Sequence, residues 1–303
     1  EYALRGEHLA FALHSTGQAA LVGELKRVSG YNWEWLKATG ASFWVKKREV
    51  LRELVEAGGK NAFVQGGRDP NKCFLWYMIC GKLQVVKLLF RTDERESSKK
   101  MLGLLERDFS DPKGKANQVA KAVAVNFMSR GRFINAVAFF CLAKNYKGAV
   151  QVAANHLKDP HLFMVICRLL MDEDERKQSL LEILLPLVET NPWYAHLTLW
   201  HAGALSRSLA PLASPPDSLD PFSAAVLGPF LRLFNNSGIM VDGKILRASD
   251  AEVRRATRAS AAAALLCGAG AGAVAEAKAL ERKDGKPAPS ADEVISAGAV
   301  QAL

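Results

Sequence analysis

Six histidines are the side chains in this sequence best suited to bind a metal or to transfer a proton. Two pairs, at 156/161 and 196/201, are five residues apart, a spacing that leaves the two imidazoles on different faces of a helix. No cysteine or carboxylate lies at a spacing that would complete a metal site beside them. We therefore expect structural or surface roles, and no metal site, for His8, His14, His156, His161, His196 and His201.

A glycine-rich segment and an acidic segment are the other places where the sequence could hold a ligand. Gly268, Gly270 and Ala273 have the spacing of a dinucleotide-binding turn, which needs a strand before it. The alanines at 261–264 favour a helix there instead. Residues 171–177, MDEDERK, lack the alternating ligands and central glycine of a calcium loop. With no P-loop or nucleophile elbow, the sequence predicts no catalysis, no cofactor and no small-molecule substrate.

Aromatic and basic side chains gather in residues 31–54, which hold three of the six tryptophans followed by four cations. Such a combination is typical of a protein-binding hot spot or of a platform for single-stranded nucleic acid. Alternatively, the tryptophans fill a corner between helices and the lysine and arginine stems cover its apolar edge. We take this cluster as a candidate protein-interaction surface made of Trp33, Trp35, Lys46, Lys47, Arg48 and Arg52.

The net charge of +9 is concentrated in the first third of the chain. Residues 1–121 contain 21 Lys and Arg against 14 Asp and Glu, whereas the remainder is nearly balanced. A positive region favours an acidic partner, whether a protein, a lipid headgroup or a nucleic acid. A solvated basic face without a dedicated partner is the alternative.

The five cysteines lie singly in apolar helical runs, without a Cys-x-x-Cys pair. This pattern predicts buried free thiols in a reducing compartment and favours the cytosol. No segment is long and apolar enough to cross a bilayer. Because the sequence begins with Glu rather than Met, we expect it to be part of a longer protein.

The elements that must position these residues follow from the spacing of apolar side chains. Residues 130–169 show three consecutive apolar faces at three- and four-residue steps, with breaks at Lys144-Asn145 and at residues 158–160. Such short connections require antiparallel neighbours. No segment shows convincing strand alternation. We predict an all-α fold, an α-solenoid of stacked antiparallel hairpins with irregular repeats, and helices at 7–28, 46–57, 70–80, 82–91, 97–107, 115–129, 132–143, 146–156, 160–171, 176–189 and 192–206, with a Trp-rich turn at 31–44.

Five Asp-Pro or Asn-Pro pairs mark expected helix starts, because the acid or amide caps the first turn and proline needs no N–H there. They lie at 69–70, 111–112, 159–160, 191–192 and 220–221. We expect four segments: the solenoid at 1–206, a Pro/Ser-rich linker or loop at 207–221, further Ala-rich helices at 222–280, including one near 249–266, and a flexible tail or short helix at 281–303.

The order of several motifs resembles the helical region of the DmX-like (rabconnectin) family over about residues 1–206. They are WLKATGASFWV (35–45), DPNKCFLWYM (69–78), VVKLLFRT (85–92), KMLGLLERDFS (100–110), RFINAVAFFCLAKNYKGAV (132–150) and LKDPHLFMVICRLL (157–170). After DFS this chain has Pro112-Lys113-Gly114-Lys115, where the family tends to have a Trp-containing helix start.

The resemblance implies a non-catalytic scaffold. Family members are large cytosolic proteins in which WD-type propellers precede an α-solenoid, and the fungal member is the large subunit of the RAVE complex. The implied function is to promote assembly of the V1 and V0 sectors of the vacuolar and endosomal H⁺-ATPase, and hence organelle acidification. The implied partners are V1 subunits and other RAVE subunits. Association with endosomal or vacuolar membranes would be peripheral, through these partners.

Two other functions fit the same helical pattern. A coat or vesicle-trafficking scaffold also combines propellers with helix pairs. A nucleic-acid-binding module would use the basic, Trp-rich start, and its affinity would fall steeply with salt. We favour the V-ATPase scaffold and expect no nucleic acid as a partner.

Overall fold

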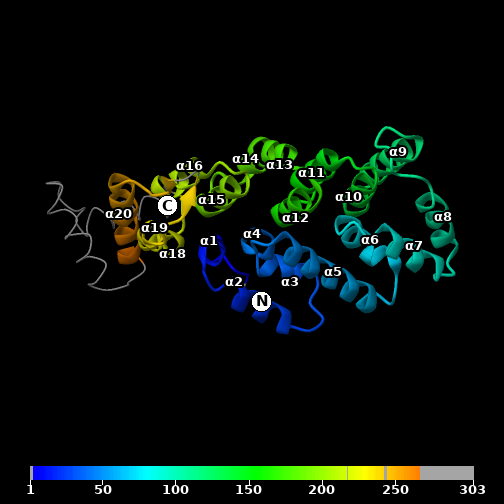
Figure 1. The fold of residues 1–303 in the computed structure, drawn as a ribbon, viewed down its shortest axis with the longest axis horizontal. Helices are drawn as coiled ribbons and strands as arrows, with labels where there is room; N and C mark the ends of the chain where they lie inside the picture. Colours follow the sequence, from blue (N-terminus) through cyan, green and yellow to red (C-terminus); the bar gives the residue numbers. More distant parts are fainter. Residues whose placement is uncertain (1–2, 217, 242–243, 267–303) are drawn as a thin grey trace. The chain divides into compact units, whose positions relative to one another are not determined.

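The computed structural model describes residues 3–216, 218–241 and 244–266 of the chain (Figure 1). Contacts within the chain define two compact units. Unit 1 comprises Glu1–Arg5 and Ser15–Pro186, and unit 2 comprises Gly6–His14 and Leu187–Leu303. The four segments expected from the sequence stay a prediction. The glycine-rich motif, Cys267 and the expected tail lie outside the described residues.

The predicted all-α class is confirmed for the described part of the chain. One small exception is an antiparallel pair of strands, β1 (Met240–Val241) and β2 (Lys244–Ile245), in which Met240 lies opposite Ile245. The sequence analysis found no convincing strand alternation in any segment. A strand of two residues is too short to show an alternating pattern.

The helices of unit 1 follow the short helix α1, and the unit ends within α14. Its helices are α2 (Gln18–Arg27), α3 (Trp33–Ala38), α4 (Ala41–Trp44), α5 (Arg48–Gln65), α6 (Pro70–Ile79), α7 (Leu83–Arg91), α8 (Glu96–Leu105), α9 (Lys115–Ser129), α10 (Phe133–Leu142), α11 (Tyr146–Asn155), α12 (Pro160–Leu170), α13 (Glu173–Ser179), a π-helical turn (Leu180–Leu184) and α14 (Leu185–Val188).

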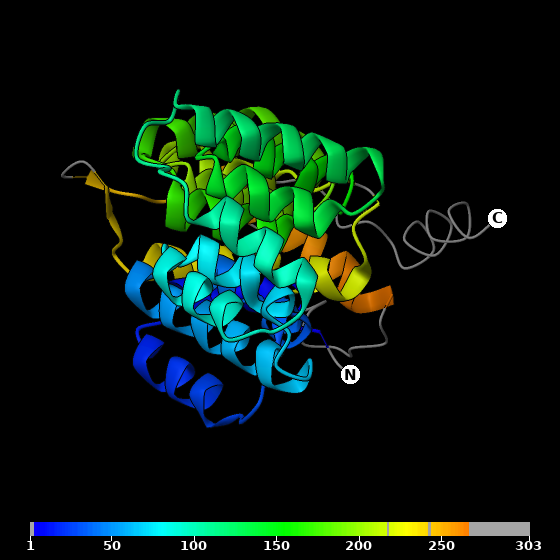
Figure 2. The same ribbon diagram turned by 90° about the vertical axis from the view of Figure 1, so that its right-hand side faces the viewer.

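The helices of unit 1 form two layers. One layer runs from α3 to α7, and the chain returns through α8 and α9 into a second layer of α10 to α12 (Figures 1 and 2). Most consecutive helices pack on each other, as α5 does on α6 and α9 on α10, and across the layers α10 packs on α6 while α12 packs on α4, α5 and α6. Residues about 60 to 120 positions apart therefore share one core, which includes Phe74 and Phe139 with ring centroids 5.3 Å apart.

The same two-residue turn connects several successive helices. In each turn the first residue has a left-handed backbone, and the N–H of the second bonds to the carbonyl five residues earlier, as in a Schellman motif. That second residue is also the N-cap of the next helix. Among the described residues, such turns lie at Gly81-Lys82, Gly131-Arg132 and Lys144-Asn145 in unit 1 and at Gly203-Ala204 in unit 2.

Four of the five predicted Pro-marked helix starts are confirmed. Asp69, Asp159, Asn191 and Asp220 each cap a helix that begins at the following proline. The fifth, at Asp111, was wrong. The carbonyl of Asp111 instead accepts the N–H of Gly114 in a turn with Pro112 at its second position, and α9 begins only at Lys115.

The single helix predicted over 7–28 is two helices, α1 (Gly6–His14) and α2, which lie in different units. The Ser15 hydroxyl accepts the N–H of Gly17 at 2.9 Å and so competes with helical hydrogen bonding at the break.

Unit 2 packs α1 against α15 and closes with α20. Its other helices are α15 (Pro192–His201), α16 (Leu205–Ser208), α17 (Ala210–Ala213), α18 (Pro221–Ala225), α19 (Leu227–Asn236) and α20 (Asp250–Leu266). Helices α17, α18 and α19 contact α20, whose Ser260 hydroxyl accepts from the Gly228 N–H and donates to the Ala224 carbonyl. Leu212 and Ala213, in the segment expected to be a linker or loop, are buried.

Candidate functional site

Trp33, the first of the six candidate surface residues, contacts two other helices of unit 1. Asn32 caps α3 by accepting the N–H of Trp35, and this cap orients the first turn. The Trp33 ring stacks on Trp76 of α6 with centroids 4.6 Å apart. Its indole N–H donates to Asp159, the N-cap of α12, at 3.1 Å. Trp33 is half-buried and joins α3 to both layers.

Trp35 has a more local environment. Its ring stacks on Tyr31 with centroids 4.9 Å apart, and it is also half-buried. Burial, and secondarily the carboxylate of Glu53, raise the pKa of the Tyr31 hydroxyl. In the described part of the chain, no hydrogen bond or ring contact joins either tryptophan to the four cations of the candidate surface.

Lys46 and Lys47 lie exposed at the turn between α4 and α5. The Lys46 ammonium group is 3.4 Å from the carbonyl of Ser15, and its backbone N–H donates to Gln18. Desolvation lowers the pKa of Lys46. Lys47 is the N-cap of α5 with an extended backbone and no capping bond from its side chain. Both lysines project from a turn that is fixed by contacts with the start of unit 1.

Arg48 makes a contact that the sequence pattern did not predict. Its guanidinium donates to the carbonyl of Leu169, near the end of α12, at 2.6 Å. In the other direction, Arg168 of α12 donates to the carbonyls of Ser42 at 2.6 Å, Val45 at 2.5 Å and Lys46 at 3.1 Å. The two arginines therefore join the α4–α5 turn to the end of α12 from both sides.

Arg168 is the residue that the sequence analysis missed. It is 7 % exposed, and no carboxylate accepts its hydrogen bonds, so burial and secondarily Arg176 lower its pKa to about 10. The one signal in the sequence was a single charge inside the apolar run FMVICRLL (163–170). A lone charge in such a run indicates a buried polar contact.

Arg52 lies one turn after Arg48 on α5 and is half-buried. Its Nε atom is buried without a hydrogen-bond partner among the described residues. Carboxylates accompany these cations, since Glu53 pairs with Lys26 and Glu56 pairs with Lys82. The structure thus brings the four cations together along one turn and the start of α5, and places the two tryptophans on α3.

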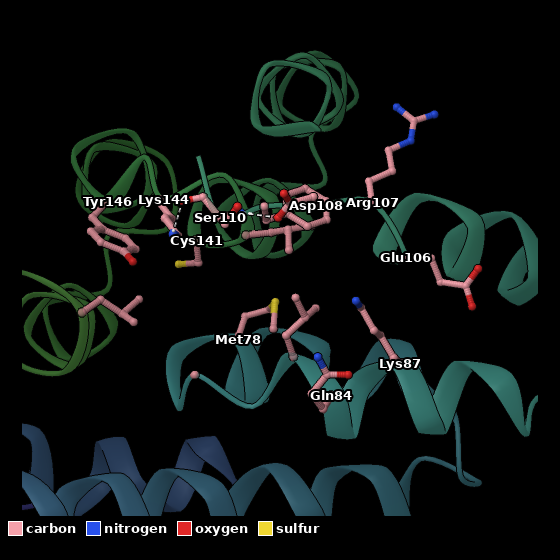
Figure 3. A pocket seen from close by; sticks show the side chains of 15 residues that line it. Met78, Gln84, Lys87, Glu106, Arg107, Asp108, Ser110, Cys141, Lys144 and Tyr146 are labelled. Carbon is pink, nitrogen blue, oxygen red and sulfur yellow. Dashed lines mark hydrogen bonds between the residues drawn. The ribbon is translucent and has the colours of Figure 1, made fainter. Parts of the chain in front are cut away.

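A pocket of about 450 Å³ lies elsewhere in unit 1, among the α6–α7 turn, the loop at 106–110 and the α10–α11 turn (Figure 3). Buried apolar groups of Met78, Phe109 and Leu142 line it, together with Lys87 and Lys144. The sequence analysis did not predict it, because its walls come from segments up to about 90 residues apart, from Met78 to Leu170.

Two of the six histidines, His196 and His161, are largely removed from solvent. His196 is fully buried, and its Nδ1 lies 2.9 Å from the carbonyl of Ser208. Burial lowers the pKa of His196, and that of His161 in unit 1, to about 4. Over residues 3–216, 218–241 and 244–266, no three His, Cys, Asp or Glu side chains are grouped to bind a metal ion.

The cysteine prediction is confirmed at four positions, since Cys73, Cys80, Cys141 and Cys167 are buried free thiols. Burial raises the pKa of each thiol, to about 12 for the first three, so these groups stay protonated at neutral pH. Every helix in the described part of the chain is too short or too polar to span a bilayer.

Comparison with known proteins confirms the resemblance drawn from the sequence. The family model for the RAVE protein 1 C terminal matches residues 2–225. DmX-like protein 1 of Homo sapiens is 28 % identical over 183 residues, or 60 % of this chain. The protein called regulator of V-ATPase in vacuolar membrane protein 1 is 23 % identical over 72 % of this chain in Saccharomyces cerevisiae and 28 % identical over 70 % in Schizosaccharomyces pombe. The chain spans 6 % of the human protein and 16 % and 17 % of the two yeast proteins.

Proposed function

The chain belongs to the RAVE protein 1 C-terminal family, and we propose that it is a helical segment of a RAVE-type regulator of the V-ATPase. The observation that carries the proposal is the family match over residues 2–225, together with relatives whose names describe V-ATPase regulation. The regulator would promote assembly of the V1 and V0 sectors, and so acidification of endosomes and vacuoles. Its partners would be V1 subunits and other RAVE subunits.

The segment would act as a scaffold, without making or breaking bonds. Helical hairpins with repeated Schellman turns, packed in an irregular solenoid, form a stiff support on which partner surfaces have a defined position. A scaffold that holds a detached V1 unit near its V0 partner raises the effective concentration of one for the other. It would work in the cytosol and reach the membrane through its partners.

The candidate contact for an acidic V1 surface is the set of cations at the α4–α5 turn. Lys46 and Lys47 are exposed there, and their charges are available beyond the intrachain contacts described above. Arg48 and Arg52 extend the positive surface along α5, although part of each serves the packing of unit 1. Trp33 and Trp35 would act by supporting α3 beneath this surface.

Affinity purification of the full-length parent, under conditions that release V1, tests the proposal. We expect V1 subunits among the recovered proteins, and about tenfold less of them with the double variant Lys46→Glu, Lys47→Glu. The double variant Lys60→Glu, Lys100→Glu is the control, because it makes the same charge change at exposed positions elsewhere in unit 1. Recovery of vesicle-coat components in place of V1 would favour a trafficking scaffold and contradict the proposal.

A further inference from the structure

The pocket of about 450 Å³ in unit 1 has the size of a site for a short peptide or a small molecule. Met78 of α6, Phe109 of the 106–110 loop and Leu142 of α10 form its apolar lining, and each is buried. Leu83, at the start of α7, is half-buried and also lines the pocket. A hollow of this volume, lined by both apolar and charged side chains, has room for one large side chain from another molecule.

Three cations line the pocket: Lys144 bonds to the Ser110 carbonyl, Arg107 points away from the pocket centre (Figure 3), and Lys87 is the one directed toward a ligand. Glu106 points away from the pocket centre and pairs with Arg91 (Figure 3). Asp108 accepts the N–H of Ser110, and the Ser110 side chain and, less strongly, Lys144 and Lys87 lower the pKa of its carboxyl group. Within the described part of the chain, Lys87 forms no hydrogen bond or ion pair, and Figure 3 shows it pointing from α7 toward the loop.

The wall opposite Lys87 is held in place by Lys144, whose backbone is left-handed (φ 54°). Gly81, Gly131 and Gly203 occupy the same position in the equivalent turns. A residue with a Cβ atom is less stable than glycine in this conformation. The Lys144 side chain supplies a compensating contact, because its ammonium group donates to the Ser110 carbonyl at 3.0 Å and connects the loop to the α10–α11 turn.

We propose that this pocket binds a peptide segment of a partner protein, with one large apolar side chain inside the pocket and a neighbouring carboxylate paired with Lys87. The apolar lining selects the inserted side chain, and the free ammonium group selects an acidic residue beside it. The proposal rests on the protein-binding function proposed above and names a second surface for it, distinct from the α4–α5 turn.

Selection from a displayed library of short random peptides on the intact chain tests this assignment. We expect the enriched peptides to share a large apolar residue next to Asp or Glu. Their affinity should fall about tenfold with Lys87→Glu and with Leu83→Ser, and stay unchanged with Lys60→Glu, an equal charge change on α5. Thermal unfolding followed by circular dichroism verifies that each variant is folded.

Exchanging the charges of Lys87 and the peptide's acidic residue distinguishes a direct ion pair between them from a general electrostatic attraction. Replacing the acidic residue of a selected peptide with lysine should weaken binding to the parent chain and restore binding to the Lys87→Glu variant. Failure to enrich any peptide, or peptides that bind the Lys87→Glu and Leu83→Ser variants as well as the parent chain, would overturn the proposal. If peptides bind in the pocket but the full-length parent captures no V1 subunit, the peptide site is supported and the proposed V-ATPase function is contradicted.

Discussion

Arg48 and Arg168 donate hydrogen bonds across the same contact in opposite directions. Arg48, at the start of α5, reaches the Leu169 carbonyl of α12, and Arg168 of α12 reaches carbonyls at 42, 45 and 46. Each segment therefore supplies both a donor and acceptors. Arg168 is buried and Arg48 is exposed, so the two should differ widely in their contribution to stability.

Replacing Arg168 with methionine should lower the free energy of unfolding by about 3 kcal/mol, because three carbonyls lose their donor in a buried position. Equilibrium denaturation in urea measures the change. Lys177→Met, which removes an exposed charge on α13, is the control and should change stability by less than about 0.5 kcal/mol. Equal effects of the two substitutions would contradict the assigned role of Arg168.

Lys144 offers a test of its left-handed backbone. Lys144→Gly and Lys144→Ala both remove the ammonium group that donates to Ser110, and they differ in the Cβ atom. We expect the glycine variant to be the more stable by about 1 kcal/mol, since glycine accepts a positive φ without strain. At Lys100, exposed within α8, the order should reverse, because glycine weakens a helix relative to alanine. Urea denaturation of the four variants gives both differences.

Two helical glycines should respond oppositely to alanine. At Gly59 of α5, an added Cβ would lie 2.7 Å from the Cβ of Trp76, and both sit in the packed contact between α5 and α6. Gly59→Ala should destabilise unit 1 by about 2 kcal/mol through overpacking. At Gly103 of α8 nothing lies within 4 Å, so Gly103→Ala should stabilise the helix by up to about 1 kcal/mol. Melting temperatures that shift in the same direction would contradict this packing.

His196 makes stability depend on pH. Its Nδ1 donates to the Ser208 carbonyl, so its Nε2 carries no proton and accepts from the Nε2 of His14 at 2.9 Å. Burial lowers its folded-state pKa from 6.5 to about 4, so the unfolded chain binds more protons between these values. The contribution of neutral His196 to the free energy of unfolding is complete above pH 6.5. It is lost as the pH falls, by roughly 3 kcal/mol near pH 4.

Urea denaturation between pH 7.5 and 4.5 measures this loss in the parent chain and in His196→Gln. The variant has no titrating group at the site and should show a shallower decline, although His161 contributes a loss of the same sign in unit 1. His156→Gln, at an exposed position, should retain the slope of the parent chain. Identical slopes in all three proteins would rule out His196 as a source of the pH dependence.

Part of the candidate surface could be predicted from sequence and part could not. The grouping of Lys46, Lys47, Arg48 and Arg52 follows from their adjacency in the chain, and an exposed turn preserves it. The separation of Trp33 and Trp35 from these cations could not be predicted from their positions in the chain, because α3 directs Trp33 toward Trp76 and Asp159. The pocket around Lys87 could not be predicted from the sequence either, because its walls come together only when the second layer packs on the first.

The sequence by itself determined the longer helices between residues 48 and 201 and most of their starts. Apolar spacing and capping residues such as Asp69 and Asp159 act within a few residues of the backbone that they organise, so their effect is readable locally. Only the tertiary structure decided that Lys144 adopts a left-handed backbone and that Arg168 is buried. Both outcomes depend on contacts with residues that are distant in sequence and become neighbours only when the two layers pack. The spacing of residues along the chain does not predict such contacts.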